Sequence, residues 1–172
     1  EYINNLNTIS STIQVLVDPV GHLATTGNWL ETTNNNLVLS NQITVNTTTY
    51  QNAGASIVQQ LAYGLAHLNE YFNDNSYNST NLEVVHFNIA VGTNYFFEIS
   101  KLRALLSLYN TLASEYDCQA QLFVNVIPTK RNKTIYDYNT NMLRTTTECM
   151  SAILGGANTV FNLPYDAIYH KD

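Results

Sequence analysis

The stretch N-M-L-R-T-T-T-E-C-M-S-A-I-L-G-G, residues 141–156, decides the fold of this chain. Its apolar side chains recur at the spacing of one amphipathic helix, and the double glycine suits a left-handed helix end. The run Q-L-F-V-N-V-I-P-T-K-R at residues 121–131 precedes the helix, and N-T-V-F-N-L-P at residues 158–164 follows it. A strand, a helix and a strand in this order predict a βαβ unit with parallel strands and a right-handed crossover. The apolar positions of the helix are Met142, Leu143, Met150, Ile153 and Leu154.

The upstream sequence repeats this unit. Strands are predicted at residues 12–17, 42–45 and 83–89, and helices at about 54–72 and 94–113. Two glycines and an asparagine run between residues 21 and 41 indicate a loop with a short helical turn. The apolar stripe of the first helix comprises Val58, Leu61, Ala62, Leu65 and Leu68. The second helix is expected to turn inward Phe96, Ile99, Leu102, Leu106, Tyr109 and Leu112.

Four βα units and part of a fifth therefore follow one another with short connections and no dividing linker. This order predicts a single α/β domain over residues 1–172. We interpret it as a partial (β/α)8 TIM barrel of parallel strands with outer helices, roughly its C-terminal half. Complete barrels run to ~250 residues, so a chain of 172 residues that begins at Glu1 is interpreted as a fragment of a longer protein.

The composition excludes several classes of function. Charged residues make up 12% of the chain and the net charge is −6, so no basic surface is available for nucleic acid. No stretch approaches the ~20 apolar residues of a membrane-spanning helix, and we therefore expect a soluble protein. Cys118 and Cys149 are too few for a disulfide framework or a four-ligand zinc site. Reduced thiols in a cytoplasm fit them best.

Polar residues inside the predicted strands are the first candidates for a site, because active sites of parallel barrels gather along the strands' interior face and carboxyl ends. His86 and Asn88 fall on one face of V-V-H-F-N-I, and Asn125 interrupts L-F-V-N-V-I in the same way. We favour the reading that these residues are hydrogen-bonded filling of a barrel interior over the reading that they form a working site.

Three blocks of the sequence carry a resemblance to a known family. They are N-A-G-A-S-I-V-Q-Q-L-A-Y-G-L-A-H-L-N at residues 52–69, T-N-Y-F-F-E-I-S-K-L-R-A at 93–104, and N-M-L-R-T-T-T-E-C-M-S-A-I-L-G-G-A-N-T-V at 141–160, preceded by Tyr136-Asp137. In this order they resemble the barrel of the methylmalonyl-CoA mutase family. D-P-V-G-H-L-A-T-T-G-N-W at residues 18–29 is similar to the small, or β, subunits of that family.

The resemblance implies that this chain has lost the family's catalytic residues. Catalytic subunits carry a G-Y-H-M-Q-E motif whose His contacts the reacting thioester carbonyl, and Thr49 stands at that His here. Their R-L-S-F-F-W segment supplies an Arg and a Ser to substrate, and Val84 and His86 stand in those places. Threonine cannot shuttle a proton near neutral pH, and valine cannot bind a carboxylate or phosphate. We therefore expect no catalytic residue, only degenerate pocket positions.

The resemblance also implies the partner and the cofactor. The expected role is that of a non-catalytic small subunit in a heterodimeric, adenosylcobalamin-dependent enzyme that interconverts (R)-methylmalonyl-CoA and succinyl-CoA. The chemistry and the cofactor would belong to the large (α) subunit. No cofactor is expected in this chain, because the family's D-x-H-x-x-G cobalamin motif is absent from its sequence and His22 follows Asp18 by four positions.

The charged residues inside the retained helix motifs are expected to form buried pairs that fix the packing of the scaffold. Arg144 and Glu148 in particular should lie four residues apart on one side of their helix, as close neighbours. The charged residues in question are Glu98, Lys101, Arg103, Arg144 and Glu148.

Two other functions remain open at this stage. The chain could belong to an active acyl-CoA mutase of altered substrate range that uses His86 as its acid, or it could be a free-standing CoA-ester binding module. We also expect the isolated half barrel to form a homodimer, because it would expose two unpaired sheet edges and an open apolar concave face. Neither nucleic acid nor a membrane is expected as a partner.

Overall fold

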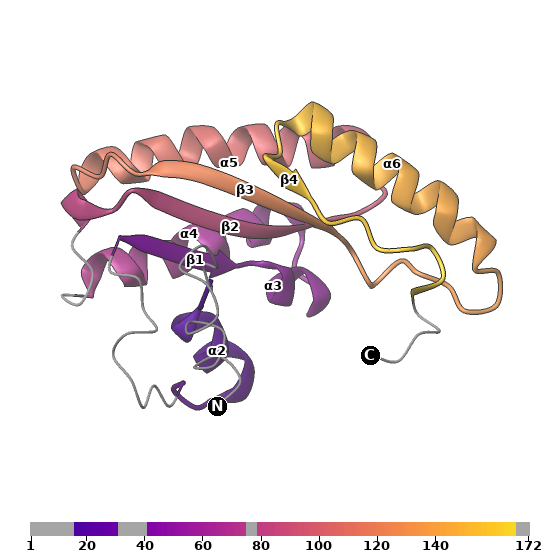
Figure 1. Cartoon of the computed structure of the whole chain (residues 1–172), viewed down its shortest axis with the longest axis horizontal. Coiled ribbons are helices and arrows are strands. Elements are labelled where there is room, and N and C mark those ends of the chain that lie inside the picture. The colour runs from indigo at the N-terminus through magenta and orange to yellow at the C-terminus, as the bar shows by residue number, and fades with distance from the viewer. Residues whose placement is uncertain (1–15, 31–40, 75–78, 168–172) are drawn as a thin grey trace, which may run out of the picture.

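A computed structural model of the chain describes residues 16–30, 41–74 and 79–167. Helices and strands alternate over most of this length (Figure 1). The elements are α2 (Pro19–Thr26), β1 (Gln42–Asn46), α3 (Thr48–Asn52), α4 (Ile57–Asn73), η1 (Ser79–Asn81), β2 (Val84–Val91), α5 (Tyr95–Glu115), β3 (Gln121–Pro128), α6 (Asn139–Gly155) and β4 (Thr159–Val160). No helix among the described residues is both long and apolar enough to cross a membrane.

The four strands form one sheet in the order β1-β2-β3-β4, and every neighbouring pair is parallel. This confirms the predicted α/β class and the parallel strands around residues 42–45, 83–89 and 121–131. The strand predicted after residue 158 is present but only two residues long. Most of the strand predicted at residues 12–17 lies outside the described residues, and Leu16 and Val17 belong to no strand.

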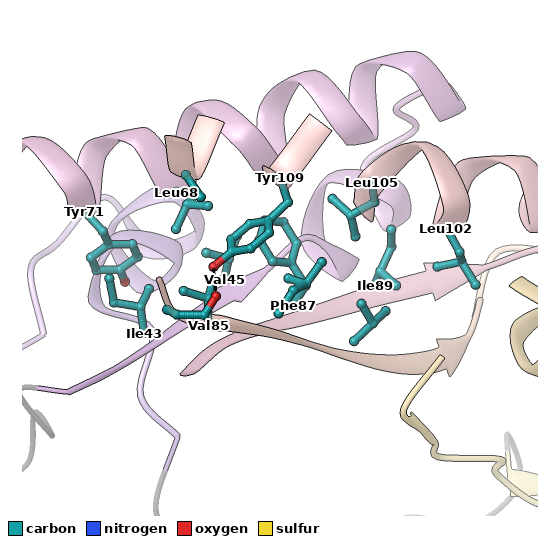
Figure 2. Close-up of a cluster of buried hydrophobic side chains, with 14 of the residues drawn as sticks. Ile43, Val45, Leu68, Tyr71, Val85, Phe87, Ile89, Leu102, Leu105 and Tyr109 are labelled. Carbon is teal, nitrogen blue, oxygen red and sulfur yellow. Dashed lines mark hydrogen bonds between the residues drawn. The ribbon is translucent and has the colours of Figure 1, made fainter. Parts of the chain in front are cut away.

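The hydrophobic core lies between the sheet and the helices. Val85, Phe87 and Ile89 alternate along β2 and are each at most 1% exposed. Figure 2 shows them on the side of the strands that faces α4 and α5, below Leu68 and Leu105. Alternate residues of a strand point to opposite faces of the sheet, so the period of two in the sequence sets which side chains enter this core.

Helix α4 begins at Ile57, a few residues after the predicted start near residue 54, and Ser56 caps it. The Ser56 hydroxyl accepts a hydrogen bond from the backbone N–H of Gln59, and the Gln59 side chain accepts one from the backbone N–H of Ser56. This reciprocal capping box satisfies two donors that the helix itself cannot pair. The cap fixes the first turn of α4 at the carboxyl edge of the sheet, next to the short helix α3.

The predicted inward stripes of α4 and α5 are only partly correct. Leu68, Leu102 and Tyr109 are buried as expected. Leu61, Leu65, Ile99 and Leu112 are half-buried. Ala62 and three large apolar side chains on these helices are instead exposed. Polar residues such as His67 and Lys101 are buried on these helices, so the buried face of each helix does not coincide with its apolar stripe. The three large side chains are Val58, Phe96 and Leu106.

Helix α6 forms over Asn139–Gly155, so the predicted helix is confirmed, but it packs through its other face. Its five apolar positions, Met142, Leu143, Met150, Ile153 and Leu154, are between 49% and 71% exposed. The buried residues are small or polar: Asn141, Thr145, Glu148, Ser151, Ala152 and Gly155. Small side chains let α6 approach α5 closely, and the buried polar ones bind neighbouring loops, so apolar periodicity alone indicated the wrong face.

Gly155 of α6 packs closely against Leu102 of α5, and we expect Gly155→Val to destabilise the fold. A Cβ built at this position would lie 3.0 Å from Cβ of Leu102, which is itself buried, so one of the helices must shift. Overpacking of this kind costs about 1–3 kcal/mol. Urea unfolding monitored by circular dichroism would measure the loss. Thr147→Val, at an exposed position of the same helix, is the control and should change the free energy of unfolding by less than about 0.5 kcal/mol.

Candidate functional site

The candidate site residues lie on the sheet face opposite the core, here called the polar face. The strand register aligns Thr44 with His86 and Phe123, and Asn46 with Asn88 and Asn125. These six residues alternate with the core residues of β1, β2 and β3, so they point away from α4 and α5. The predicted homodimer rested in part on an open apolar face of the sheet, but five of these six side chains are polar. Homodimer formation itself stays a prediction.

Asn88 and Asn125 meet on the polar face, where the sequence predicted hydrogen-bonded polar residues. The Asn125 amide donates a hydrogen bond from Nδ2 to Oδ1 of Asn88 over 3.0 Å. Asn46, the next residue in this row, uses its side-chain oxygen to accept hydrogen bonds from the backbone N–H and the hydroxyl of Thr48. Amides donate and accept hydrogen bonds but take up no proton near neutral pH. This row can orient a bound group but cannot perform acid–base chemistry.

His86 is half-buried on the polar face, and its ring is tilted against Phe123 with the centroids 5.4 Å apart. Its Nδ1 atom is buried and has no hydrogen-bond partner within the described part of the chain. Burial lowers the pKa of His86 below its ordinary value of 6.5. The imidazole is therefore neutral at pH 7, and it can offer a hydrogen bond but no positive charge.

Thr49, the residue aligned with the family's His, lies outside the strands. It sits in the short helix α3, and its hydroxyl donates to the backbone oxygen of Asn46 over 3.1 Å. Val84 is the first residue of β2 and pairs with Gln42, at the opposite end of β1. The five residues of β1 span about 13 Å, so the structure does not bring Thr49 and Val84 together.

The buried charges support the scaffold around this site. Glu98 and Lys101 form an ion pair and are 4% and 1% exposed, as the sequence predicted. The Lys101 ammonium also donates to Oε1 of Gln60 over 2.9 Å and to the backbone oxygen of Ala90 over 2.6 Å. Glu98 accepts a hydrogen bond from the backbone N–H of Gly92. Burial lowers the pKa of Lys101, and the neighbouring carboxylate opposes that shift. The pair joins α4, α5 and the end of β2.

Glu148 pairs with a different partner from the one predicted. Lys133, in the loop after β3, donates to its carboxylate over 2.6 Å, and Asn132 donates to the other carboxylate oxygen. Arg144 instead donates to the backbone oxygen of Asn132, so the two residues share a neighbour and do not pair with each other. Burial raises the pKa of Glu148, although the hydrogen bonds from Asn132 and Lys133 oppose the shift. Arg103, exposed on α5, binds the backbone oxygen of Leu154.

A second polar network was missed in the sequence. Asp18 caps α2 by accepting from the backbone N–H of Gly21, and its other oxygen accepts from the backbone N–H of Asn46 at the end of β1. His67 of α4 contacts the same carboxylate through Nε2 over 3.0 Å, and Tyr71 donates to it over 2.7 Å. The Asp-Pro pair at residues 18–19 was a readable signal for a helix start. Nothing local in the sequence linked it to His67.

The same network includes Tyr50 of α3, whose hydroxyl lies 3.1 Å from Nδ1 of His67. If Nε2–H of His67 donates to Asp18, the Tyr50 hydroxyl is the donor to Nδ1. The network thus fastens α2, α3 and α4 to the end of β1. It offers only one histidine and one carboxylate, and among the described residues no three His, Cys, Asp or Glu side chains are grouped to hold a metal ion.

Comparison with known proteins shows the family to which the chain belongs. The family described as methylmalonyl-CoA mutase matches residues 6–171 of the chain. The methylmalonyl-CoA mutase small subunit of Porphyromonas gingivalis is 34% identical over 138 residues, covering 75% of this chain and 22% of that protein. The small subunit of Streptomyces virginiae is 33% identical over 135 residues, which cover 72% and 21%.

A relative without "small subunit" in its name is nearly as similar. The methylmalonyl-CoA mutase of Cereibacter sphaeroides is 31% identical over 140 residues, covering 76% of this chain and 20% of that protein. The chain thus spans about a fifth of the length of the curated relatives that it matches.

Proposed function

The chain belongs to the methylmalonyl-CoA mutase family, and from this premise we propose that it is part of the barrel domain of a small subunit that does no chemistry itself. The catalytic partner would be a large (α) subunit that holds adenosylcobalamin and interconverts methylmalonyl-CoA and succinyl-CoA. The names of the relatives from Porphyromonas gingivalis and Streptomyces virginiae, both called small subunits, support a larger partner.

One observation carries the proposal: at neutral pH the expected pocket positions hold no cation and no protonated acid. Thr49 directs its hydroxyl to a backbone oxygen, and Val84 has an aliphatic side chain. His86 is the one titratable group among the three, and burial keeps it neutral at pH 7. A developing oxyanion would find neither a cation nor a positioned acid among these three residues.

The retained scaffold supports the same proposal. Four parallel strands follow one another in sequence order, with α5 and α6 covering the same side of the sheet (Figure 1). This arrangement is what part of a TIM barrel requires, and we propose that the remaining strands of the subunit close it. The ion pairs of Glu98 with Lys101 and of Glu148 with Lys133 hold its outer helices in place. The helix motifs that pack the scaffold are retained, whereas Thr49 and Val84 stand at positions where the family has catalytic residues.

His86 favours a second candidate, an active acyl-CoA mutase of altered substrate range. Its Nδ1 atom is buried and has no hydrogen-bond partner among the described residues, so the structure gives this polar atom no role in packing. The lowered pKa argues against a role as an acid, because a neutral imidazole provides a weaker proton donor than an imidazolium. We therefore rank this candidate second.

The experiment that tests the proposal is an assay of the full-length subunit, purified alone and with its large subunit, in the presence of adenosylcobalamin. We expect turnover of methylmalonyl-CoA by the complex and none by the small subunit, and Thr49→His in the small subunit should not create activity. Turnover by the small subunit alone would overturn the proposal.

A variant of the small subunit separates the two candidates. In the small subunit assayed alone, an acid at position 86 would contribute roughly 100-fold or more, so the second candidate predicts turnover that His86→Ala nearly abolishes. Turnover by the small subunit alone that is lost in His86→Ala, with the variant still folded by circular dichroism, would favour the active mutase.

A further inference from the structure

An open cavity of about 660 Å³ lies at the carboxyl edge of the sheet, away from the polar face. Its walls come from the loops that follow β2 and β3, from α3, and from the first turns of α4 and α5. None of the degenerate pocket positions Thr49, Val84 and His86 lines it. The cavity is therefore a separate feature, and its interpretation does not depend on whether the subunit is catalytic.

Arg131 supplies a positive charge to this cavity. Its guanidinium donates through NH1 to the backbone oxygen of Gln51 over 3.0 Å, which anchors an otherwise exposed side chain against the wall. A guanidinium has five N–H donors, so most of them remain for a ligand. Lys130 is exposed next to it, and both lie in an acidic chain of net charge −6.

Backbone and amide donors line the same cavity. Gln51 is 7% exposed, and the hydrogen bonds of its side chain in the described part of the chain involve Oε1 alone, which accepts from Thr129. Gln51 lines the cavity, and its Nε2 amide has hydrogen-bond donors that are not used within the described part of the chain. Asn94 begins the 21-residue helix α5 without a side-chain cap, so first-turn N–H groups of α5 also lack a side-chain acceptor. Uncapped N–H groups and the helix dipole favour an anion here.

Glu98 is the acidic residue of the lining, and it does not repel an anion as a free carboxylate would. Its carboxylate is paired with the ammonium of Lys101 and accepts from the backbone N–H of Gly92. The pair is neutral overall, so the guanidinium of Arg131 sets the sign of the charge in the cavity.

Part of the lining is apolar. Ile57 and Val58 lie in the first turn of α4, and Phe97 lies in the first turn of α5. Val58 and Phe97 are 75% and 68% exposed, so each presents apolar surface to solvent. From these observations we infer that the cavity binds a small organic anion, with its charged group on Arg131 and the Gln51 amide and its apolar body against Val58 and Phe97.

Calorimetric titration of the full-length subunit with phenyl phosphate, benzoate and inorganic phosphate tests this inference. We expect saturable binding of an aromatic anion, tighter than that of inorganic phosphate, and no saturable binding of neutral benzyl alcohol. The stronger of phenyl phosphate and benzoate identifies a phosphate or a carboxylate as the natural charged group. Because hydrogen bonds to a charged group are worth about 1.5–3 kcal/mol, Arg131→Gln should weaken binding about tenfold or more.

Arg103→Gln is the matched control. Arg103 is also exposed and also binds a backbone oxygen, that of Leu154, but it does not line the cavity. Its substitution changes the net charge of the chain by the same amount as Arg131→Gln. Because Arg103 lies outside the cavity, the affinity should stay within about twofold. Equal weakening by both variants, unchanged binding to Arg131→Gln, or equal binding of benzyl alcohol would each overturn the inference. Circular dichroism of both variants checks that a loss of binding does not reflect unfolding.

Discussion

Replacing Glu98 with glutamine is expected to destabilise the chain by about 3–5 kcal/mol, a large share of the 5–15 kcal/mol that holds a typical domain folded. The substitution keeps the size of the side chain but removes its charge. It leaves the Lys101 ammonium, which is 1% exposed, without a counter-ion in the interior. Urea unfolding followed by circular dichroism would measure the change.

Two further variants show whether the uncompensated charge is the cause. Glu98→Gln combined with Lys101→Met removes both charges, so it should be more stable than Glu98→Gln alone, although Lys101 also binds Gln60 and Ala90. Glu115→Gln, at an exposed position of the same helix, should change the free energy of unfolding by less than about 0.5 kcal/mol. A loss under about 1 kcal/mol in Glu98→Gln would show that the pair is not essential to the packing of α5.

The strands could be predicted from the sequence because their side chains obey a strict period of two. Buried residues on one face and polar ones on the other made β2 readable from V-V-H-F-N-I. The hydrogen bond between Asn88 and Asn125 depends on the register of β2 and β3, which the pattern does not give. Parallel order followed from the alternation of strands and helices. The helix cap at Ser56 also has a local signature, which the chain meets with Gln59 three residues later.

The packing of α6 could not be predicted in the same way. Its apolar stripe is regular, but the helix lies against α5 through Gly155 and Ala152, where small size matters more than hydrophobicity. Asn141 adds a second reason, since its side-chain amide pairs with both the backbone N–H and the backbone oxygen of Thr134. Such contacts depend on where a distant loop arrives, and no periodicity in the helix reveals them.

Partners of buried charges were equally hard to assign. Arg144 is four residues from Glu148 and was the natural choice on helical spacing. Lys133 lies 15 residues away and takes that place because the loop after β3 folds back over α6. Asp18 and His67 are 49 residues apart, and only the end of β1 brings them together. Sequence spacing identifies neighbours within one helix, whereas these pairs are made by the tertiary fold.

The Asp18 network leads to the last prediction, in which Asp18→Asn destabilises the chain by about 2–4 kcal/mol at pH 7 and flattens its response to acid. Burial alone would raise the pKa of Asp18, but hydrogen bonds and charge from His67, with hydrogen bonds from Tyr71 and Gly21, hold it below its ordinary value of 3.8. A carboxylate with a lowered pKa stabilises the fold fully above its unfolded-state pKa. That contribution is lost as the pH falls through its folded-state pKa.

Urea unfolding at several pH values would therefore show the wild-type chain losing stability below pH 3.8 more steeply than Asp18→Asn, with the two curves converging in acid. Burial raises the pKa of Glu148, so the protonation of Glu148 changes the stability in the opposite direction as the pH falls. Glu148 is present in both proteins, so its effect cancels in the difference between their stabilities. Glu83→Gln, at an exposed position beside β2, is the control and should keep the wild-type slope. Parallel curves for Asp18→Asn and the wild type would mean that Asp18 does not hold its charge against burial, and that the junction of α2, α4 and β1 owes its stability to packing alone.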